Sequence, residues 1–261
     1  MINLYPPSGS VDKTKRSIGP PEAAEKIASD LNQRFICVAR GFRFHEEVNM
    51  ALDPESLATW YFRLNGFFTM KNFIVHPDLG RGQRTDIDVF GVRLPFRQEL
   101  VSDPMEDDGN FTKVGQKAFL AIVEVKSGRI KINSTWREPA LRNVHRFLRA
   151  AGPFDLARVD EVANAIYQRG SYERDPQWHV ALVGVGRSRN AVLAHDLSGL
   201  MQITWADISS FIFKRFSKYN QQKEIHMQWD PDARALWNIW ECHRDSSRKF
   251  DGAILAMVGK R

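Results

Sequence analysis

Two carboxylates lie inside an apolar segment of the sequence, where burial of a charge is costly unless a partner compensates it. Asp86 and Asp88 alternate there with Ile87 and Val89. Successive side chains of a β-strand point to opposite faces, so the two aspartates are predicted to share one face and the two apolar residues the other. A divalent cation held by oxygen ligands is one reason for such carboxylates.

A second charged pair ends the most apolar run of the chain. Glu124 and Lys126 are predicted to share one face of a strand over 118–126. An unpaired buried charge is costly, so the segment requires either a plain ion pair or a divalent cation held by Asp and Glu beside the lysine. A solvated Glu–Lys pair at the end of a surface strand is the simplest alternative, but the run 118–123 is too apolar for an edge strand.

The helices and strands that position these residues can be predicted from hydrophobic periodicity and from capping and turn residues. Strands are expected over 67–76, 85–94, 118–126, 179–185 and 201–204. Helices are expected from Pro20, over 54–64, 137–150, 159–168 and 205–219, and from Pro231. Thr204 and Asp207 resemble a capping box. This order predicts an α/β fold, with one mixed sheet between helices and extra helices at both ends.

A polar insertion over 95–116 separates the second and third predicted strands. It contains an acidic run made of Asp103, Glu106, Asp107 and Asp108. Its spacing matches no calcium-loop pattern, so a solvated surface loop is favoured over a metal-binding loop.

Composition bounds the class of protein. The 261 residues carry a formal net charge of +6, which is compatible with a polyanionic partner. The two cysteines, Cys37 and Cys242, form neither a disulfide framework nor a zinc cluster, so a cytoplasmic location is expected. The longest apolar run is far shorter than the ~20 residues of a membrane span, so no membrane partner is expected.

Several segments together resemble the PD-(D/E)XK nuclease superfamily. The signature residues are Asp88 and the Glu124-Val125-Lys126 triplet. The run 55–62, closed by Gly66, resembles the first helix of Holliday-junction-resolvase-like and Mrr-like members, and 86–90 resembles their acidic strand. The resemblance covers about residues 54–185 and not the ends of the chain. It implies a restriction-endonuclease-like core over 54–186. The patterns outside this region predict an N-terminal extension over 1–53 with one helix and a C-terminal helical extension over 187–261 packed on the core.

The resemblance also implies a set of site residues. The catalytic residues would be Glu55, Asp88, Glu124 and Lys126. A Mg²⁺ ion, replaceable by Mn²⁺, would be held by Asp88, Glu124, the carbonyl of Val125 and, for a second metal or its water, Glu55. Lys126 would orient or deprotonate the attacking water and stabilise the transition state.

Which aspartate would bind the metal is left open by the sequence. Asp88 is favoured because it lies inside an apolar strand, and Asp86 is second. Asp78 follows a proline in a literal Pro-Asp pair, but the surrounding residues 77–82 are typical of a turn, so it is third.

Basic and polar residues near these segments predict contacts with nucleic acid. Arg81 and Arg84 precede the aspartate strand. The residues predicted to bind phosphate after the strand that ends at Lys126 are Ser127, Arg129, Lys131 and Arg137. Arg142, Arg146 and Arg149 form a further basic stripe, for which an exposed helix face is nearly as good an explanation.

These features predict a Mg²⁺-dependent nuclease, with DNA as the favoured substrate. Restriction, phage (antiviral) defence, and DNA repair or recombination are the expected contexts. A homodimer or a complex with a partner protein is a further expectation. Two alternatives are a non-catalytic nucleic-acid-binding or scaffold module that retains the fold, and a metal-dependent hydrolase acting on RNA or nucleotides.

Overall fold

A computed structural model describes residues 52–224 and 229–259. The chain divides into two compact units, residues 1–48 and 49–261, and all described residues belong to the second. The helix predicted from Pro20 therefore lies outside the described residues.

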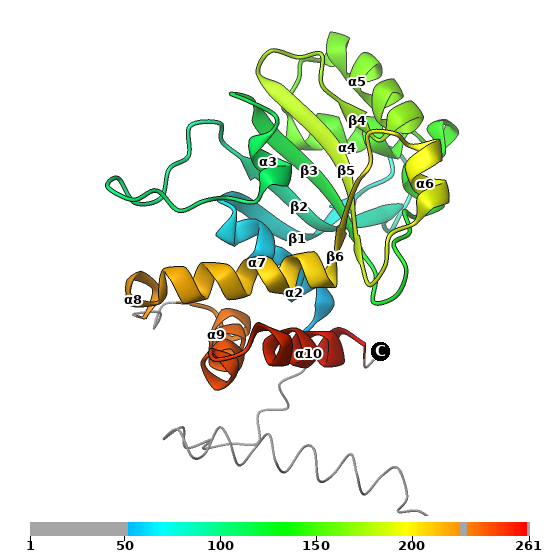
Figure 1. Ribbon diagram of the computed structural model, residues 1–261. Helices are drawn as coiled ribbons and strands as arrows, with labels where there is room; N and C mark the ends of the chain where they lie inside the picture. Colours follow the sequence, from blue (N-terminus) through cyan, green and yellow to red (C-terminus); the bar gives the residue numbers. More distant parts are fainter. Residues whose placement is uncertain (1–51, 225–228, 260–261) are drawn as a thin grey trace, which may run out of the picture. The chain divides into compact units, whose positions relative to one another are not determined.

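The centre of the second unit is a mixed six-stranded sheet (Figure 1). Its strands are β1 (Phe67–Val75), β2 (Thr85–Arg93), β3 (Ala118–Val125), β4 (Ser171–Tyr172), β5 (Trp178–Gly186) and β6 (Met201–Thr204). The order is β1-β2-β3-β5-β4, and β6 also pairs with β5. The β3–β5 and β5–β6 pairs are parallel and the others antiparallel. The α/β class and the mixed sheet are confirmed.

Helices cover both faces of the sheet. One cluster of buried residues joins the sheet to α2 (Pro54–Leu64), α7 (Trp205–Lys218), α9 (Pro231–His243) and α10 (Ser247–Val258). A second cluster joins it to α4 (Asn143–Ala151), α5 (Leu156–Arg169) and α6 (Ala191–Asp196). The shorter elements are α3 (Gly109–Thr112), η1 (Ser134–Trp136), η2 (Pro139–Leu141) and α8 (Asn220–Lys223).

Strand β3 lies at the centre of this arrangement. All eight of its residues are buried. Val123 and Val125 belong to the α2/α7 cluster, and Leu120 and Ile122 to the α4/α5 cluster. Strand β3 is therefore covered on both faces, which confirms the prediction that this apolar run forms a central strand and not an edge strand.

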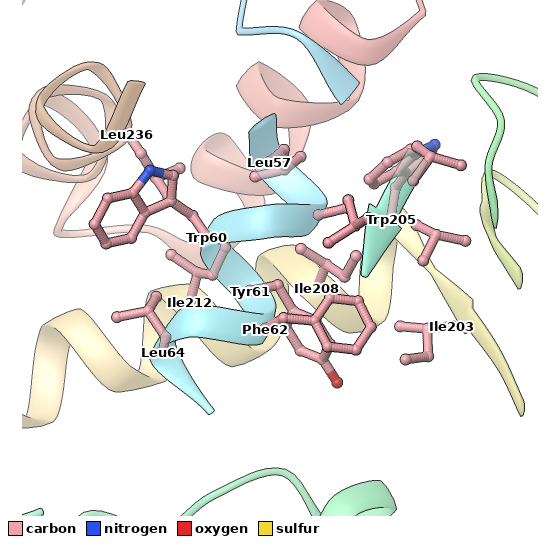
Figure 2. Packing of buried hydrophobic residues seen from close by; sticks show 14 of the residues in the cluster. Leu57, Trp60, Tyr61, Phe62, Leu64, Ile203, Trp205, Ile208, Ile212 and Leu236 are labelled. Atoms are coloured by element: carbon pink, nitrogen blue, oxygen red, sulfur yellow. The ribbon is translucent and has the colours of Figure 1, made fainter. Parts of the chain in front are cut away.

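Helices α2 and α7 pack against each other on the first face. Figure 2 shows Leu57 and Phe62 of α2 among Trp205, Ile208 and Ile212 of α7. The predicted capping box at the start of α7 is confirmed, because Thr204 and Asp207 bond reciprocally to each other's backbone N–H. These contacts fix the first turn of α2, which carries Glu55.

The alternation of side chains is interrupted where the first two strands pass Asp88. The register of the β1–β2 ladder places Asn72 opposite Asp88, but these two residues do not pair. Asn72 has a left-handed backbone with φ of 53°. On either side of this break, Ile87 packs in the α4/α5 cluster and Val89 in the α2/α7 cluster. The prediction that Ile87 and Val89 share one face is therefore wrong, because a local backbone break overrides the period of two.

The insertion between β2 and β3 is not a purely solvated loop. Asp107 has a side chain only 5% exposed and lies 2.7 Å from Arg93 and 3.0 Å from Arg215. Asp108 accepts a hydrogen bond from the Tyr61 hydroxyl and caps α3. Two of the four acidic residues thus tie the insertion to β2, α2 and α7, and the solvated-loop interpretation is wrong for them.

The helix predicted over 137–150 begins later than expected. Pro139 starts a separate 3-10 turn, and Arg142 adopts a left-handed conformation with φ of 53° before α4 begins at Asn143. No helix of the described residues has the length and apolarity needed to cross a membrane.

Candidate active site

The side chains of Asp88, Glu124 and Lys126 meet between the adjacent strands β2 and β3. Lys126 Nζ lies 3.0 Å from Glu124 Oε2 and 3.5 Å from Asp88 Oδ2. Since one nitrogen touches both carboxylates, their oxygens are no farther apart than these two distances laid end to end. Two oxygens that bind one Mg²⁺ lie at most about 4 Å apart, and this bound allows the two carboxylates to approach that distance around a shared cation.

Asp88 is held in place by the end of the β2–β3 ladder. The regular pairing ends at Val89 and Val123. One residue further on, Asp88 Oδ2 accepts a hydrogen bond of 2.6 Å from the backbone N–H of Val125. The carboxylate thus satisfies a backbone donor where the ladder stops, which points it at the Glu-x-Lys segment.

Glu124 is fully buried, and one of its two carboxylate oxygens accepts no hydrogen bond from the described residues. Oε2 accepts from Lys126, whereas Oε1 is buried and has no hydrogen-bond partner among the described residues. Burial raises the pKa of Glu124 to about 7; Lys126 opposes this shift and the Asp88 carboxylate adds to it. A buried acceptor without a donor costs ~1–3 kcal/mol. A positively charged ligand bound to this oxygen would remove that cost.

Lys126 carries the compensating charge. Burial alone would lower its pKa, but the carboxylates of Glu124 and Asp88 outweigh burial and raise the pKa above its ordinary value. The lysine is therefore protonated at neutral pH in this arrangement.

Glu55 faces the site from the first turn of α2 without joining the central pair. Burial raises its pKa, and the Asp88 carboxylate is the next largest cause. Lys71 of β1 opposes this shift and donates to Ser56 Oγ at 2.8 Å. Lys71 is a charged neighbour of the site that sequence reasoning missed, because a single lysine in an aromatic strand gives no signal of its own.

The donor set can be compared with the needs of a hard divalent cation. Within residues 52–224 and 229–259, no group of three or more Asp, Glu, His or Cys side chains lies close enough to bind one ion. Glu55 therefore does not complete a three-carboxylate cluster. The two central carboxylates, one of them with an unpartnered buried oxygen, still suit Mg²⁺, which binds proteins through one or two carboxylates and keeps several waters.

The alternative aspartates lie elsewhere. Asp78 is exposed and forms an ion pair with Arg146, whose Nε lies 2.9 Å from Asp78 Oδ2. The Arg146 guanidinium lowers the pKa of Asp78. Asp86 is half-buried, and its backbone carbonyl accepts from Trp136 Nε1 at 3.3 Å. Neither side chain joins the contact between Glu124 and Lys126.

A turn that sequence reasoning missed supports the site from the α4 side. The Thr135 hydroxyl lies 3.2 Å from that of Thr85 in β2, and Asn143 donates to the Thr135 carbonyl at 3.0 Å. The backbone of Asn133 opposes the raised pKa of Glu124. The contact between Thr85 and Thr135 joins residues 50 apart in sequence, so no local pattern could have indicated it.

Most of the residues predicted to bind phosphate have exposed side chains. Arg81, Arg84, Lys131 and Arg137 are exposed, and Ser127 is half-buried. Arg129 is exposed and donates to Asn190 Oδ1 at 3.0 Å, while Arg137 pairs with Asp196 at 3.1 Å.

The segment after Lys126 is fixed against the segment after β5. Arg187 N donates to the carbonyl of Gly128 at 2.6 Å, and Ile130 N to that of Ser188 at 2.9 Å. A Cβ at Gly186 would lie 2.7 Å from the Gly128 oxygen, so only glycine fits there. This close approach holds Arg129 near the end of β3.

The chain matches no protein-family model, and comparison with curated proteins and with solved structures gives no match either.

Proposed function

We propose that the chain is a metal-dependent nuclease with a restriction-endonuclease-like core of the PD-(D/E)XK type. One observation carries the proposal: a fully buried Glu124 with an unpartnered oxygen, beside Asp88 and Lys126 at the end of the central strand. A cation would satisfy Glu124 Oε1, which a plain ion pair with Lys126 leaves unpartnered at a cost in free energy.

The metal-binding residues under this proposal are Asp88 and Glu124, with the Val125 carbonyl as a further oxygen. Mg²⁺, or Mn²⁺ in its place, would supply an acidified water and neutralise charge on the phosphate. Glu55 lies in the first turn of α2, and its raised pKa favours holding the proton of a water or alcohol over binding the cation directly.

The raised pKa of Lys126 favours one of the two roles expected for it. A lysine that keeps its proton cannot accept one from water, whereas its positive charge can stabilise the pentavalent phosphate. Lys126 is therefore assigned a charge-stabilising role.

DNA is the favoured substrate because exposed arginines precede β2 and follow β3, the two strands that carry the site residues. Arg81 and Arg84 lie before β2, and Arg129 follows β3; neither Arg81 nor Arg84 has a side-chain hydrogen bond or ion pair among the described residues. Restriction, phage defence, and repair or recombination would all employ such an enzyme.

Cleavage of DNA tests the proposal directly. The full chain is incubated with linear, circular, single-stranded and branched DNA, and with RNA, in Mg²⁺ or in EDTA. Cleavage of at least one DNA in Mg²⁺ alone is expected. Cleavage restricted to RNA would support the RNA-directed alternative, and binding of DNA without cleavage would support the non-catalytic one.

Arg129→Ala is expected to weaken DNA binding equally for all sequences. Its guanidinium would contact phosphate, and losing one such contact reduces the salt slope of log K by ~0.9 for duplex DNA. Binding is measured by fluorescence anisotropy from 50 to 300 mM salt with Ca²⁺ in place of Mg²⁺. Arg169→Ala, on α5, is the control. An altered sequence preference with an unchanged slope would contradict the phosphate role.

A further inference from the structure

An apolar surface remains open at the first edge of the sheet. Phe68, Met70, Leu94 and Phe96 are 70%, 53%, 51% and 77% exposed. Phe68, Leu94 and Phe96 also line a hollow of about 790 Å³. We name these four residues the β1 patch.

The β1 patch adjoins unpaired backbone. Within the described part of the chain, β1 pairs only with β2, so its outer side is a free strand edge. An exposed apolar edge strand is a template for pairing with another strand, and proteins usually protect such an edge with charge. Here the one charged residue of β1, Lys71, directs its ammonium at Ser56 and Asp53 of its own chain.

We propose that the β1 patch is the interface of a two-fold symmetric dimer of this chain, formed by antiparallel pairing of the two β1 edges about Thr69. The left-handed Asn72 ends the regular edge, which leaves the segment 67–71 for pairing. A two-fold axis at the centre of that segment makes the contact isologous.

The sequence of the segment is self-complementary in this register. Phe68 lies opposite Met70 of the partner subunit, and Met70 opposite Phe68 of the partner subunit. Contacts between sulfur and an aromatic ring contribute ~0.3–1.5 kcal/mol each. Thr69 lies opposite its own copy, and Thr–Thr pairs are among the favourable cross-strand pairs. No like charges face each other across the pairing.

The area is also what a dimer needs. At about 150–250 Å² for a fully exposed aromatic side chain, the four residues expose roughly 500 Å². A standard interface buries about 800 Å² per partner, of which about 65% is apolar in homodimers. The dimer reaches that apolar share when it covers the hollow beside Phe68, lined by Leu94 and Phe96, as well as the paired edge.

Oligomeric state and cross-linking test the interface. Wild-type chain is expected to sediment as a dimer at 1–100 µM, and Phe68→Glu is expected to raise the dimer dissociation constant at least ~100-fold. Leu156→Glu, at an exposed leucine of α5, should leave the dimer unchanged. A wild-type monomer at 100 µM, or a dimer equally stable in Phe68→Glu, would overturn the proposal.

Cysteine cross-linking tests the register and does not depend on the fold of the glutamate variant. Directly opposite Cβ atoms lie ~4.5–5.5 Å apart, close to disulfide geometry. Thr69→Cys should therefore form a covalent dimer on mild oxidation, above the baseline of the wild-type chain. In Asn72→Cys the two thiols would lie ~20 Å apart along the paired strands. Equal cross-linking of the two variants would overturn the pairing about Thr69.

Discussion

Asp88→Asn is expected to abolish DNA cleavage and the stabilisation of the protein by Mg²⁺ together, whereas Lys126→Ala should abolish cleavage alone. The asparagine keeps the shape of the side chain that accepts from Val125 N, so the strand end is preserved. It removes the charge that would hold the cation. The lysine is not a metal ligand, so its loss leaves the two carboxylates to bind Mg²⁺.

The size of the effect separates this result from general weakening of the site. Loss of an aligned transition-state charge costs about 10²–10³-fold in rate. Single-turnover cleavage rates and melting temperatures with and without Mg²⁺ are measured for wild type and both variants. The expected outcome is a Mg²⁺-induced rise in melting temperature that survives in Lys126→Ala and disappears in Asp88→Asn.

Asp86→Asn is the matched control, because it makes the same change two residues away on β2. Its rate and its Mg²⁺ response should remain close to those of wild type, since the Asp86 side chain does not join the Glu124–Lys126 contact. If Asp86→Asn is inactive and Asp88→Asn cuts at the wild-type rate, the assignment of the two aspartates must be exchanged.

The strands that carry the site could be predicted from sequence to within one residue. The apolar run of β3 and the stop at Pro77 after β1 are local signals, and the structure ends these strands at Val125 and Val75. The shared face of Glu124 and Lys126 followed from local alternation, whereas the choice of Asp88 as their partner came from the resemblance to the nuclease signature. Local sequence patterns are therefore enough to predict where these strands begin and end.

Other features depend on contacts between distant residues and could not be predicted. The left-handed Asn72 breaks the alternation beside Asp88, yet nothing in its neighbours marks it. Asp107 looks like a solvated residue in an acidic run, but Arg93 and Arg215 from other elements bury it. The two-residue strand β4 is too short to have a period and exists only because β5 pairs with it.

Helix α10 was missed for a different reason. Phe250, Ile254 and Val258 are spaced for one buried helix face, and all three are buried. Gly252 in the middle of this stretch lowers its helix propensity by about 1 kcal/mol. Packing against α7 and α9 outweighs that local cost.

The stability of the protein is expected to fall as the pH rises from about 4.5 to 7, and Glu124→Gln should remove this loss. Burial raises the pKa of Glu124 from 4.5 to about 7 in the folded chain. A raised folded pKa means that the folded state holds the proton more tightly than the unfolded state. Its contribution is therefore complete below pH 4.5 and lost as the pH passes 7. The shift corresponds to about 3 kcal/mol.

Glutamine mimics the protonated side chain at every pH. Urea unfolding in EDTA at pH 5 and pH 8 should show wild type losing up to about 3 kcal/mol more than Glu124→Gln between the two conditions. Glu106→Gln, at an exposed residue, is the control and should lose as much as wild type. Equal pH dependence in Glu124→Gln and wild type would show that Glu124 is not held protonated by burial.

Repeating the measurement with Mg²⁺ separates a metal site from a plain buried ion pair. A cation binds only the ionised carboxylate, so it should stabilise wild type most at pH 8, where Glu124 has lost its proton. The same Mg²⁺ should have little effect on wild type at pH 5 or on Glu124→Gln at either pH. If Mg²⁺ leaves wild type unchanged at pH 8, Glu124 and Lys126 form an ion pair alone, and the nuclease proposal loses its metal ligand.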